Sequence, residues 1–127
     1  MVSLFLLSHS AKVVEGIKDI AAEMAKEAPI FVAGGTPDGG LGSDYELIKD
    51  TLLKAYNTDG VVILFDLGSS AMTAGLVLDE LDDDVKSKIE VSNAPLVEGA
   101  IVAAVEIASG SKLEDVMGTL KDIEMVK

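Results

Sequence analysis

The chain contains a single histidine, His9, which stands directly after an apolar run of strand-like composition, residues 2–8. One aspartate, Asp66, follows a second such run, residues 60–65, which is rich in β-branched side chains. A carboxylate beside an imidazole accepts the proton of one ring nitrogen and fixes the tautomer, so the other nitrogen keeps a lone pair for attack. If the fold brings these two strand ends together, His9 and Asp66 form a reactive imidazole with its orienting partner.

Three chemistries are open to this pair. A Ser-His-Asp hydrolase is disfavoured because the chain has no Gly-x-Ser-x-Gly sequence, and Ser8 and Ser10 are chain neighbours of the histidine itself. A general base needs a substrate pocket and a second reacting group, which the sequence does not identify. A histidine nucleophile that takes up a phosphoryl group and passes it on needs only surroundings that bind an anion.

Segments suited to binding anions through backbone amides favour the phosphoryl carrier. A helix is predicted to begin at Gly68, and free N–H groups at a helix start attract phosphate. A glycine-rich loop, residues 34–42, follows another strand and flanks the same crevice. The candidate phosphoryl-binding residues are Gly68, Ser69, Ser70, Ser10, Gly34 and Gly35. Because the chain has no arginine and no nucleotide-binding glycine motif, we predict a phosphate carrier with no cofactor and no metal.

A receiver domain is an alternative interpretation of Asp66. Such domains accept a phosphoryl group on an aspartate at the end of the third strand, and acidic residues at the end of the first strand hold Mg²⁺. Here the end of the first strand holds Ser8, His9 and Ser10, and no fifth strand offers the expected lysine. The sequence therefore favours phosphorylation of the histidine over the aspartate.

Short apolar runs alternate with amphipathic segments, a pattern typical of parallel strands joined by helices. The predicted strands are residues 2–8, 30–33, 60–65 and 89–92, and the predicted helices are 12–26, 45–56, 68 to about 81, 96–108 and 113–121. We expect a flavodoxin-like α/β fold with a parallel sheet of order 2-1-3-4 and helices on both faces, and we consider an additional edge strand near Ile123–Val126. That order places His9 and Asp66 at the crevice where the strand order reverses.

Two local features complete this prediction. The acidic run at residues 79–84 is interpreted as a solvated helix end and loop. The apolar face of the first helix is predicted to consist of Val13, Ile17, Ile20, Ala21 and Met24.

Composition restricts the class of protein. The 127 residues match one domain, and we expect residues 1–127 to form a single unit. A formal net charge of −12 disfavours binding to nucleic acid or to an anionic membrane surface, and the absence of cysteine excludes disulfides and thiolate chemistry. No signal peptide and no apolar run of membrane-spanning length is present, so a cytoplasmic location is expected.

Four segments at predicted strand and helix ends carry a family resemblance. In chain order they are Ser8-His9-Ser10, Gly42-Ser43-Asp44, Asp66-Leu67-Gly68-Ser69 and Ala94-Pro95-Leu96-Val97-Glu98-Gly99. Together they resemble the phosphotransfer subunits of phosphoenolpyruvate-dependent dihydroxyacetone kinases, whose EIIA domain belongs with those of the mannose-type sugar phosphotransferase system. The last segment favours the dihydroxyacetone branch over the sugar-transport branch. The resemblance covers nearly the whole chain, except the loop at residues 36–41 and the tail after residue 123.

The resemblance implies that His9 accepts a phosphoryl group from phosphohistidine of the carrier protein HPr. His9 then passes it to ADP bound on a nucleotide-binding kinase subunit, while Asp66 orients the imidazole. Related EIIA domains are dimers, and a mean hydropathy of +0.39 in so acidic a chain also favours a homodimer. Two alternatives remain open: a mannose-type EIIA domain that feeds a sugar permease, and a non-enzymatic phospho-relay or regulatory module of the same fold.

Overall fold

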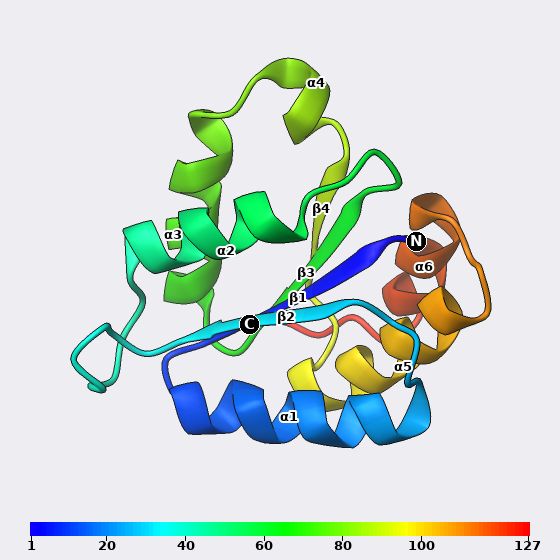
Figure 1. The fold of residues 1–127 in the computed structure, drawn as a ribbon, viewed down its shortest axis with the longest axis horizontal. Helices are drawn as coiled ribbons and strands as arrows, with labels where there is room; N and C mark the ends of the chain where they lie inside the picture. Colours follow the sequence, from blue (N-terminus) through cyan, green and yellow to red (C-terminus); the bar gives the residue numbers. More distant parts are fainter.

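The computed structural model describes residues 1–127 as a four-stranded parallel sheet with helices on both faces (Figure 1). The strands are β1 (Ser3–Ser8), β2 (Ile30–Gly34), β3 (Val61–Phe65) and β4 (Ile89–Ser92). The helices are α1 (Ala11–Met24), α2 (Tyr45–Ala55), α3 (Gly68–Asp79), α4 (Asp83–Lys86), α5 (Leu96–Ala108) and α6 (Leu113–Lys121). The predicted strands and five long helices are all present, and where their bounds differ from the prediction the shift is one or two residues.

The order of the sheet is β2-β1-β3-β4, which confirms the predicted topology. In the parallel register, Leu7 of β1 lies opposite Phe65 of β3, and Ser8 lies opposite Gly34 of β2. The residues that follow β1, β2 and β3 therefore emerge together at one end of the sheet. Since β1 leads to α1 on one face and β3 leads to α3 on the other, this end is the switch point expected for ligand binding.

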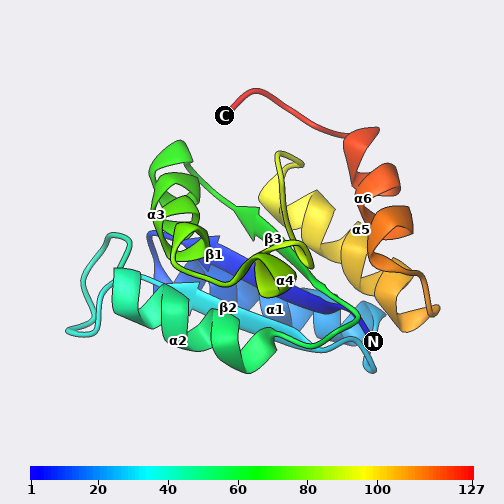
Figure 2. The same ribbon diagram turned by 90° about the horizontal axis from the view of Figure 1, so that it is seen from above.

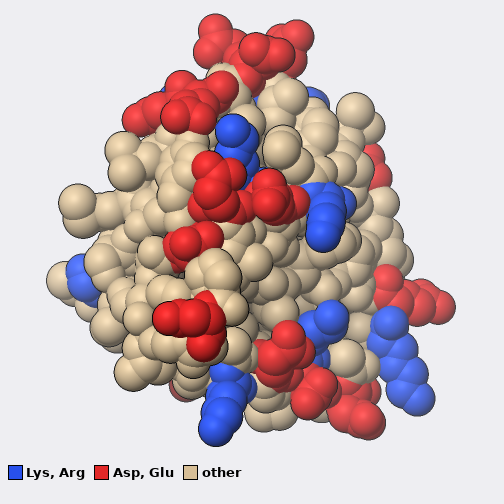
Figure 3. Space-filling view, turned by 60° about the vertical axis from the view of Figure 1, so that its left-hand side comes forward, with Lys and Arg blue, Asp and Glu red and all other residues tan.

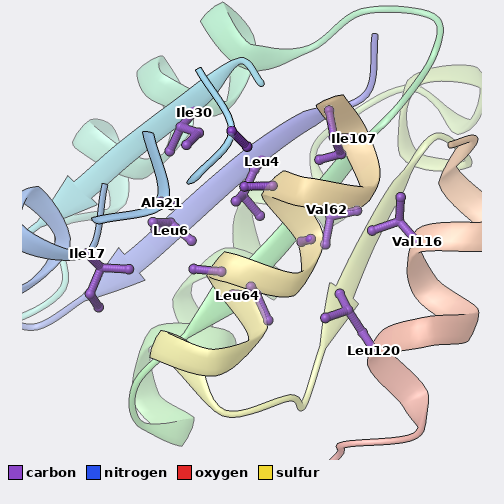
Figure 4. Packing of buried hydrophobic residues seen from close by; sticks show 14 of the residues in the cluster. Leu4, Leu6, Ile17, Ala21, Ile30, Val62, Leu64, Ile107, Val116 and Leu120 are labelled. Carbon is purple, nitrogen blue, oxygen red and sulfur yellow. The ribbon is translucent and has the colours of Figure 1, made fainter. Parts of the chain in front are cut away.

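Alternate residues of the central strands enter two separate hydrophobic clusters. On one face, Leu4, Leu6 and Leu64 pack against α1, α5 and α6, as the close view shows (Figure 4). On the other face, Phe5 and Leu7 pack against α2 and α3. Every residue of β1 and β3 is buried, as expected of parallel strands covered on both faces. These strands give the switch point a rigid support.

The predicted edge strand at Ile123–Val126 is wrong. After α6 the chain crosses the end of the sheet instead of running along an edge (Figure 2). The Met125 N–H donates to the carbonyl oxygen of Asn93 at 3.0 Å, one residue beyond the end of β4. A strand would need a ladder of such bonds, but β4 has already ended where the tail meets it.

Two further local predictions are corrected. The acidic run is exposed at the end of α3, as predicted, but its last two residues, Asp83 and Asp84, begin a short helix, α4. The buried face of α1 consists of Val14, Ile17 and Ala21, whereas three of the predicted residues, Val13, Ile20 and Met24, are exposed. None of the helices is long and apolar enough to cross a membrane.

Candidate functional site

His9 lies in the short connection between β1 and α1, and hydrogen bonds on both sides hold its backbone. Its N–H donates to Asp66 Oδ2 at 2.9 Å, and its carbonyl oxygen accepts from the Gly42 N–H at 2.9 Å. Helix α1 begins two residues later, where the Ser10 side chain caps it by accepting from the Val13 N–H at 3.4 Å. The position of the imidazole is thus fixed by a strand end, a helix start and the glycine-rich loop.

The imidazole of His9 is held at both ring nitrogens. Nδ1 lies 3.1 Å from Asp66 Oδ1 and 3.3 Å from Oδ2, and Nε2 lies 2.7 Å from Ser69 Oγ. An ionised carboxylate accepts hydrogen bonds only, so Nδ1 carries the ring proton and Nε2 carries the lone pair. The Ser69 hydroxyl donates to that lone pair. Because 27% of the histidine side chain is exposed, Nε2 is the nitrogen available to an incoming group.

Asp66 collects hydrogen bonds from several neighbours. Besides the His9 ring and backbone, its carboxylate accepts from Ser8 Oγ at 2.9 Å, Ser70 Oγ at 3.1 Å and the Leu67 N–H at 2.6 Å. Burial raises the pKa of this carboxyl, but the bonds from the backbone N–H groups of His9 and Leu67, from Ser8 and from the His9 ring outweigh it. The result is a pKa of about 2. Asp66 is therefore ionised at neutral pH, and its carboxylate acts only as an acceptor of these hydrogen bonds.

Helix α3 begins beside the free nitrogen of His9. Its N-cap residue, Leu67, makes no side-chain capping bond, so no side chain caps the N–H groups that begin the helix. The Ser69 hydroxyl points to Nε2, whereas Ser70 is buried, with its Oγ 3.2 Å from Nδ1. The structure thus brings Ser69 and Ser70 to the imidazole, and Gly68 is the first residue of the same helix.

The remaining predicted site residues lie around the histidine backbone and make no hydrogen bond to its ring. Ser10 caps α1. Gly34 lies so close to the β1–α1 turn that an added Cβ would come within 2.5 Å of the Ser10 carbonyl oxygen. Gly35 adopts a φ of +70°, which glycine tolerates, and its N–H donates to the Ser8 carbonyl oxygen at 3.2 Å. These three residues shape the connection that carries His9.

The site is completed by two residues that the sequence analysis did not predict as site residues. Ser8 is buried at the end of β1 and donates to Asp66, and its strand-end position next to His9 was the available signal. Ser43 lies with its Oγ 3.1 Å from Ser70 Oγ, so it extends the hydrogen-bond network into the loop before α2. Periodicity and spacing do not indicate this contact, although Ser43 stands in the Gly42-Ser43-Asp44 segment that carries the family resemblance.

The surface around His9 is shallow and partly apolar. Leu41, Leu67 and Met72 are 80%, 59% and 74% exposed. The two cavities of the structure lie elsewhere. The larger, about 600 Å³, lies at the opposite end of the strands, where Lys88 and Leu113 line it, and the smaller one lies on α5. A reactive imidazole on an open surface suits a phosphoryl group that arrives on another macromolecule.

Comparison with known proteins agrees with this geometry. Residues 3–117 match a family model, EIIA-man, described as the PTS system fructose IIA component. The chain belongs to the EIIA-man family. It is 35% identical over 124 residues to the phosphoryl donor subunit DhaM of PEP-dependent dihydroxyacetone kinase 2 from Listeria innocua, covering 97% of this chain and 99% of that protein. The predicted family is thus confirmed.

Two other matches show how EIIA-man domains are used. The chain is 31% identical to the DhaM subunit of PEP-dependent dihydroxyacetone kinase from Escherichia coli, but it covers 92% of this chain and only 26% of that longer protein. The crystal structure of the unknown function protein EF1359 superposes with a TM-score of 0.86 at 31% identity, covering 98% of this chain and 96% of that one. An EIIA-man unit therefore occurs both as a short chain and within a longer one.

Proposed function

We propose that this chain is the phosphoryl donor subunit of a phosphoenolpyruvate-dependent dihydroxyacetone kinase, and that His9 carries the phosphoryl group. The observation that carries the proposal is the ring geometry: Asp66 occupies Nδ1, and Nε2 faces outward toward Ser69. The similarity to DhaM subunits supports the choice of kinase.

In the charging step, the Nε2 lone pair of His9 attacks the phosphorus of phosphohistidine on HPr. The N–P bond to the donor ring breaks, and its electron pair returns to that ring. The proton on Nδ1 stays in place, where the Asp66 carboxylate stabilises the positive charge that develops on the imidazole. The Ser69 hydroxyl gives up its bond to Nε2 and donates instead to a phosphoryl oxygen, beside the N–H groups that begin α3.

In the delivery step, a β-phosphate oxygen of ADP attacks the same phosphorus. The Nε2–P bond breaks, its electron pair returns to the imidazole, and ATP forms on the nucleotide-binding kinase subunit. This chain needs no nucleotide site of its own, because the acceptor arrives already bound to its partner. Asp66 keeps Nδ1 protonated throughout, so the leaving imidazole is neutral.

Both partners have to reach the same exposed nitrogen, so they bind one after the other. Figure 3 shows the side of the molecule that lies at the left of Figure 1, with the loop between β2 and α2. Acidic side chains are spread over this side, with several lysines and uncharged surface between them. We propose that HPr and the kinase subunit present basic groups toward it, because complementary charge accelerates association.

A labelling experiment tests the proposed function. The protein is incubated with HPr charged from labelled phosphoenolpyruvate, and the label is then offered to ADP with the kinase subunits or to components of a sugar permease. We expect acid-labile, alkali-stable label on the wild type, none on His9→Gln, and delivery to ADP. Delivery to the sugar components alone would support the mannose-type alternative, and label on Asp66 in His9→Gln would support the receiver alternative.

We further propose that the chain forms a homodimer. Helices α1 and α5 pack side by side, and their outer surfaces expose Ile20, Met24, Val97 and Val105. Covering such side chains with a second copy removes apolar surface from water. Light scattering at micromolar concentration is expected to give twice the 13.2 kDa mass of one chain. A mass of one chain would contradict the proposal.

A further inference from the structure

The tail after α6 brings a lysine to the end of β3, next to the residue that orients His9. It passes Asn93, where the Met125 N–H is bound, and then crosses the end of β3 toward α3 (Figure 2). At the end of the tail, the Lys127 ammonium donates to the carbonyl oxygen of Phe65 at 2.6 Å. The same ammonium lies 4.0 Å from the centroid of the Phe65 ring. Two contacts therefore fix this cation at the last residue of β3.

The carbonyl that Lys127 binds belongs to the peptide unit of Asp66. Pairing of β3 with β4 ends at Leu64 and Ser92, so the Phe65 carbonyl lies beyond the reach of the neighbouring strand. Lys127 supplies the missing donor. The ammonium consequently lies one peptide unit from the residue whose carboxylate holds the His9 ring. Burial lowers the pKa of the lysine, and attraction to Asp66 acts against that change.

The charge balance of the site makes such a cation significant. A phosphoryl group brings about two negative charges to a position already occupied by the Asp66 carboxylate. The whole chain carries a net charge of −12 and contains no arginine. Two other lysines, Lys49 and Lys86, pair with Glu80 and Asp79 away from the site. Lys127 is the lysine whose hydrogen bond joins it to the strand end of the site.

We propose that Lys127 is a positioning and charge-compensating residue of the phosphorylated state: it holds the Phe65–Asp66 peptide in place and offsets the charge that the phosphoryl group adds at His9. This inference rests on the proposed phosphorylation of His9. It assigns a role to the tail, which would otherwise serve only to cover the end of the sheet.

The test compares variants that separate charge from hydrogen bonding. Lys127→Gln keeps an N–H donor for the Phe65 carbonyl but removes the charge, and Lys127→Arg keeps both. Lys121→Gln removes a charge from the last turn of α6 and serves as the matched control. Each protein is equilibrated with charged and uncharged HPr, and the phosphorylated fraction is measured at low and high salt. Thermal unfolding of each variant establishes that the fold is retained.

We expect Lys127→Gln to lower the equilibrium constant for phosphorylation by about three- to tenfold, because one nearby charge in a surface dielectric has an effect of this order. The effect should shrink at high salt, which screens charge and leaves a purely structural contact unchanged. Lys127→Arg and Lys121→Gln should match the wild type. An unchanged constant in Lys127→Gln, or equal losses in Lys127→Gln and Lys121→Gln, would overturn the inference.

A chemical donor separates this inference from the proposed function. Phosphoramidate charges exposed histidines without a protein donor: Nε2 of His9 attacks phosphorus and ammonia leaves. If HPr fails to charge the wild type, the proposed donor is wrong, and the comparison is made with phosphoramidate instead. Slower charging of Lys127→Gln than of Lys121→Gln by phosphoramidate then supports the role of Lys127, and equal rates refute it.

Discussion

Replacing Asp66 by asparagine removes the negative charge that accepts hydrogen bonds from five donors and leaves the size of the side chain unchanged. The pKa of Asp66 falls from 3.8 to about 2 in the folded protein. A decrease of this size corresponds to about 2 kcal/mol of stability at neutral pH. The side chain is 23% exposed, so solvent screens this interaction less than it would on an open surface. Asp66→Asn is therefore expected to lower the free energy of unfolding by about 2 kcal/mol at pH 7.

The pH dependence gives this prediction its sign. Because the folded pKa of Asp66 is lower than the unfolded one, its stabilising effect is fully present above pH 3.8 and is lost as the pH falls toward 2. Urea unfolding should show that the difference in free energy of unfolding between wild type and Asp66→Asn is constant from pH 7 to about pH 4. Below that, the difference should shrink by about 1.4 kcal/mol per pH unit.

The same variant tests the role of Asp66 in transfer. Without the carboxylate, Nδ1 loses its acceptor and the ring samples both tautomers, so charging by HPr should slow by roughly 10²–10⁴-fold. The two readouts together are decisive. A stability difference that does not change between pH 7 and pH 3, or a wild-type transfer rate in Asp66→Asn, would refute the argument that hydrogen bonds to an ionised Asp66 order the site.

Three further perturbations test separate parts of the structure. Ser69→Ala removes the hydroxyl that lies 2.7 Å from His9 Nε2; it should slow charging by about tenfold, the worth of one hydrogen bond, and leave the thermal midpoint unchanged. Gly34→Ala places a Cβ 2.5 Å from the Ser10 carbonyl oxygen, so urea unfolding should show a loss of about 1–3 kcal/mol, and an unaltered midpoint would contradict the close contact. Charging by HPr should slow as ionic strength rises beyond about 0.15 M, where the Debye length is about 8 Å, and a rate independent of salt would instead assign docking to the exposed Leu41 and Met72.

The meeting of His9 and Asp66 was predictable because it depends on topology. Apolar runs located the strands, and the order 2-1-3-4 places the ends of the first and third strands side by side. The start of α3 near His9 was also predictable. Gly68 follows Asp66 by only two residues, so the helix has to begin close to the end of β3. These features need only the period of the side chains and the handedness of the connections.

Other parts of the site were not predictable because long-range contacts determine them. Ser43 reaches the site through a loop whose course depends on the bond between Gly42 and His9. The tail that carries Lys127 is too short to show a reliable period, and its course is set by long-range hydrogen bonds of Met125 to Asn93 and of Lys127 to Phe65. In α1, the adjacent Val13 and Val14 are both apolar, so the sequence alone does not decide which of them faces the sheet.

The double attachment of His9 to Asp66 also determines what changes during each cycle of the proposed phosphorylation. One carboxylate binds both the backbone N–H and the ring of His9, so the imidazole is oriented when the protein folds rather than when a partner arrives. Only the exposed Ser69 hydroxyl has to turn when the phosphoryl group comes or leaves. If His9 is the proposed carrier residue, so little internal rearrangement means that the frequency of productive collisions sets the rate of transfer, which then depends on the concentrations of the partners.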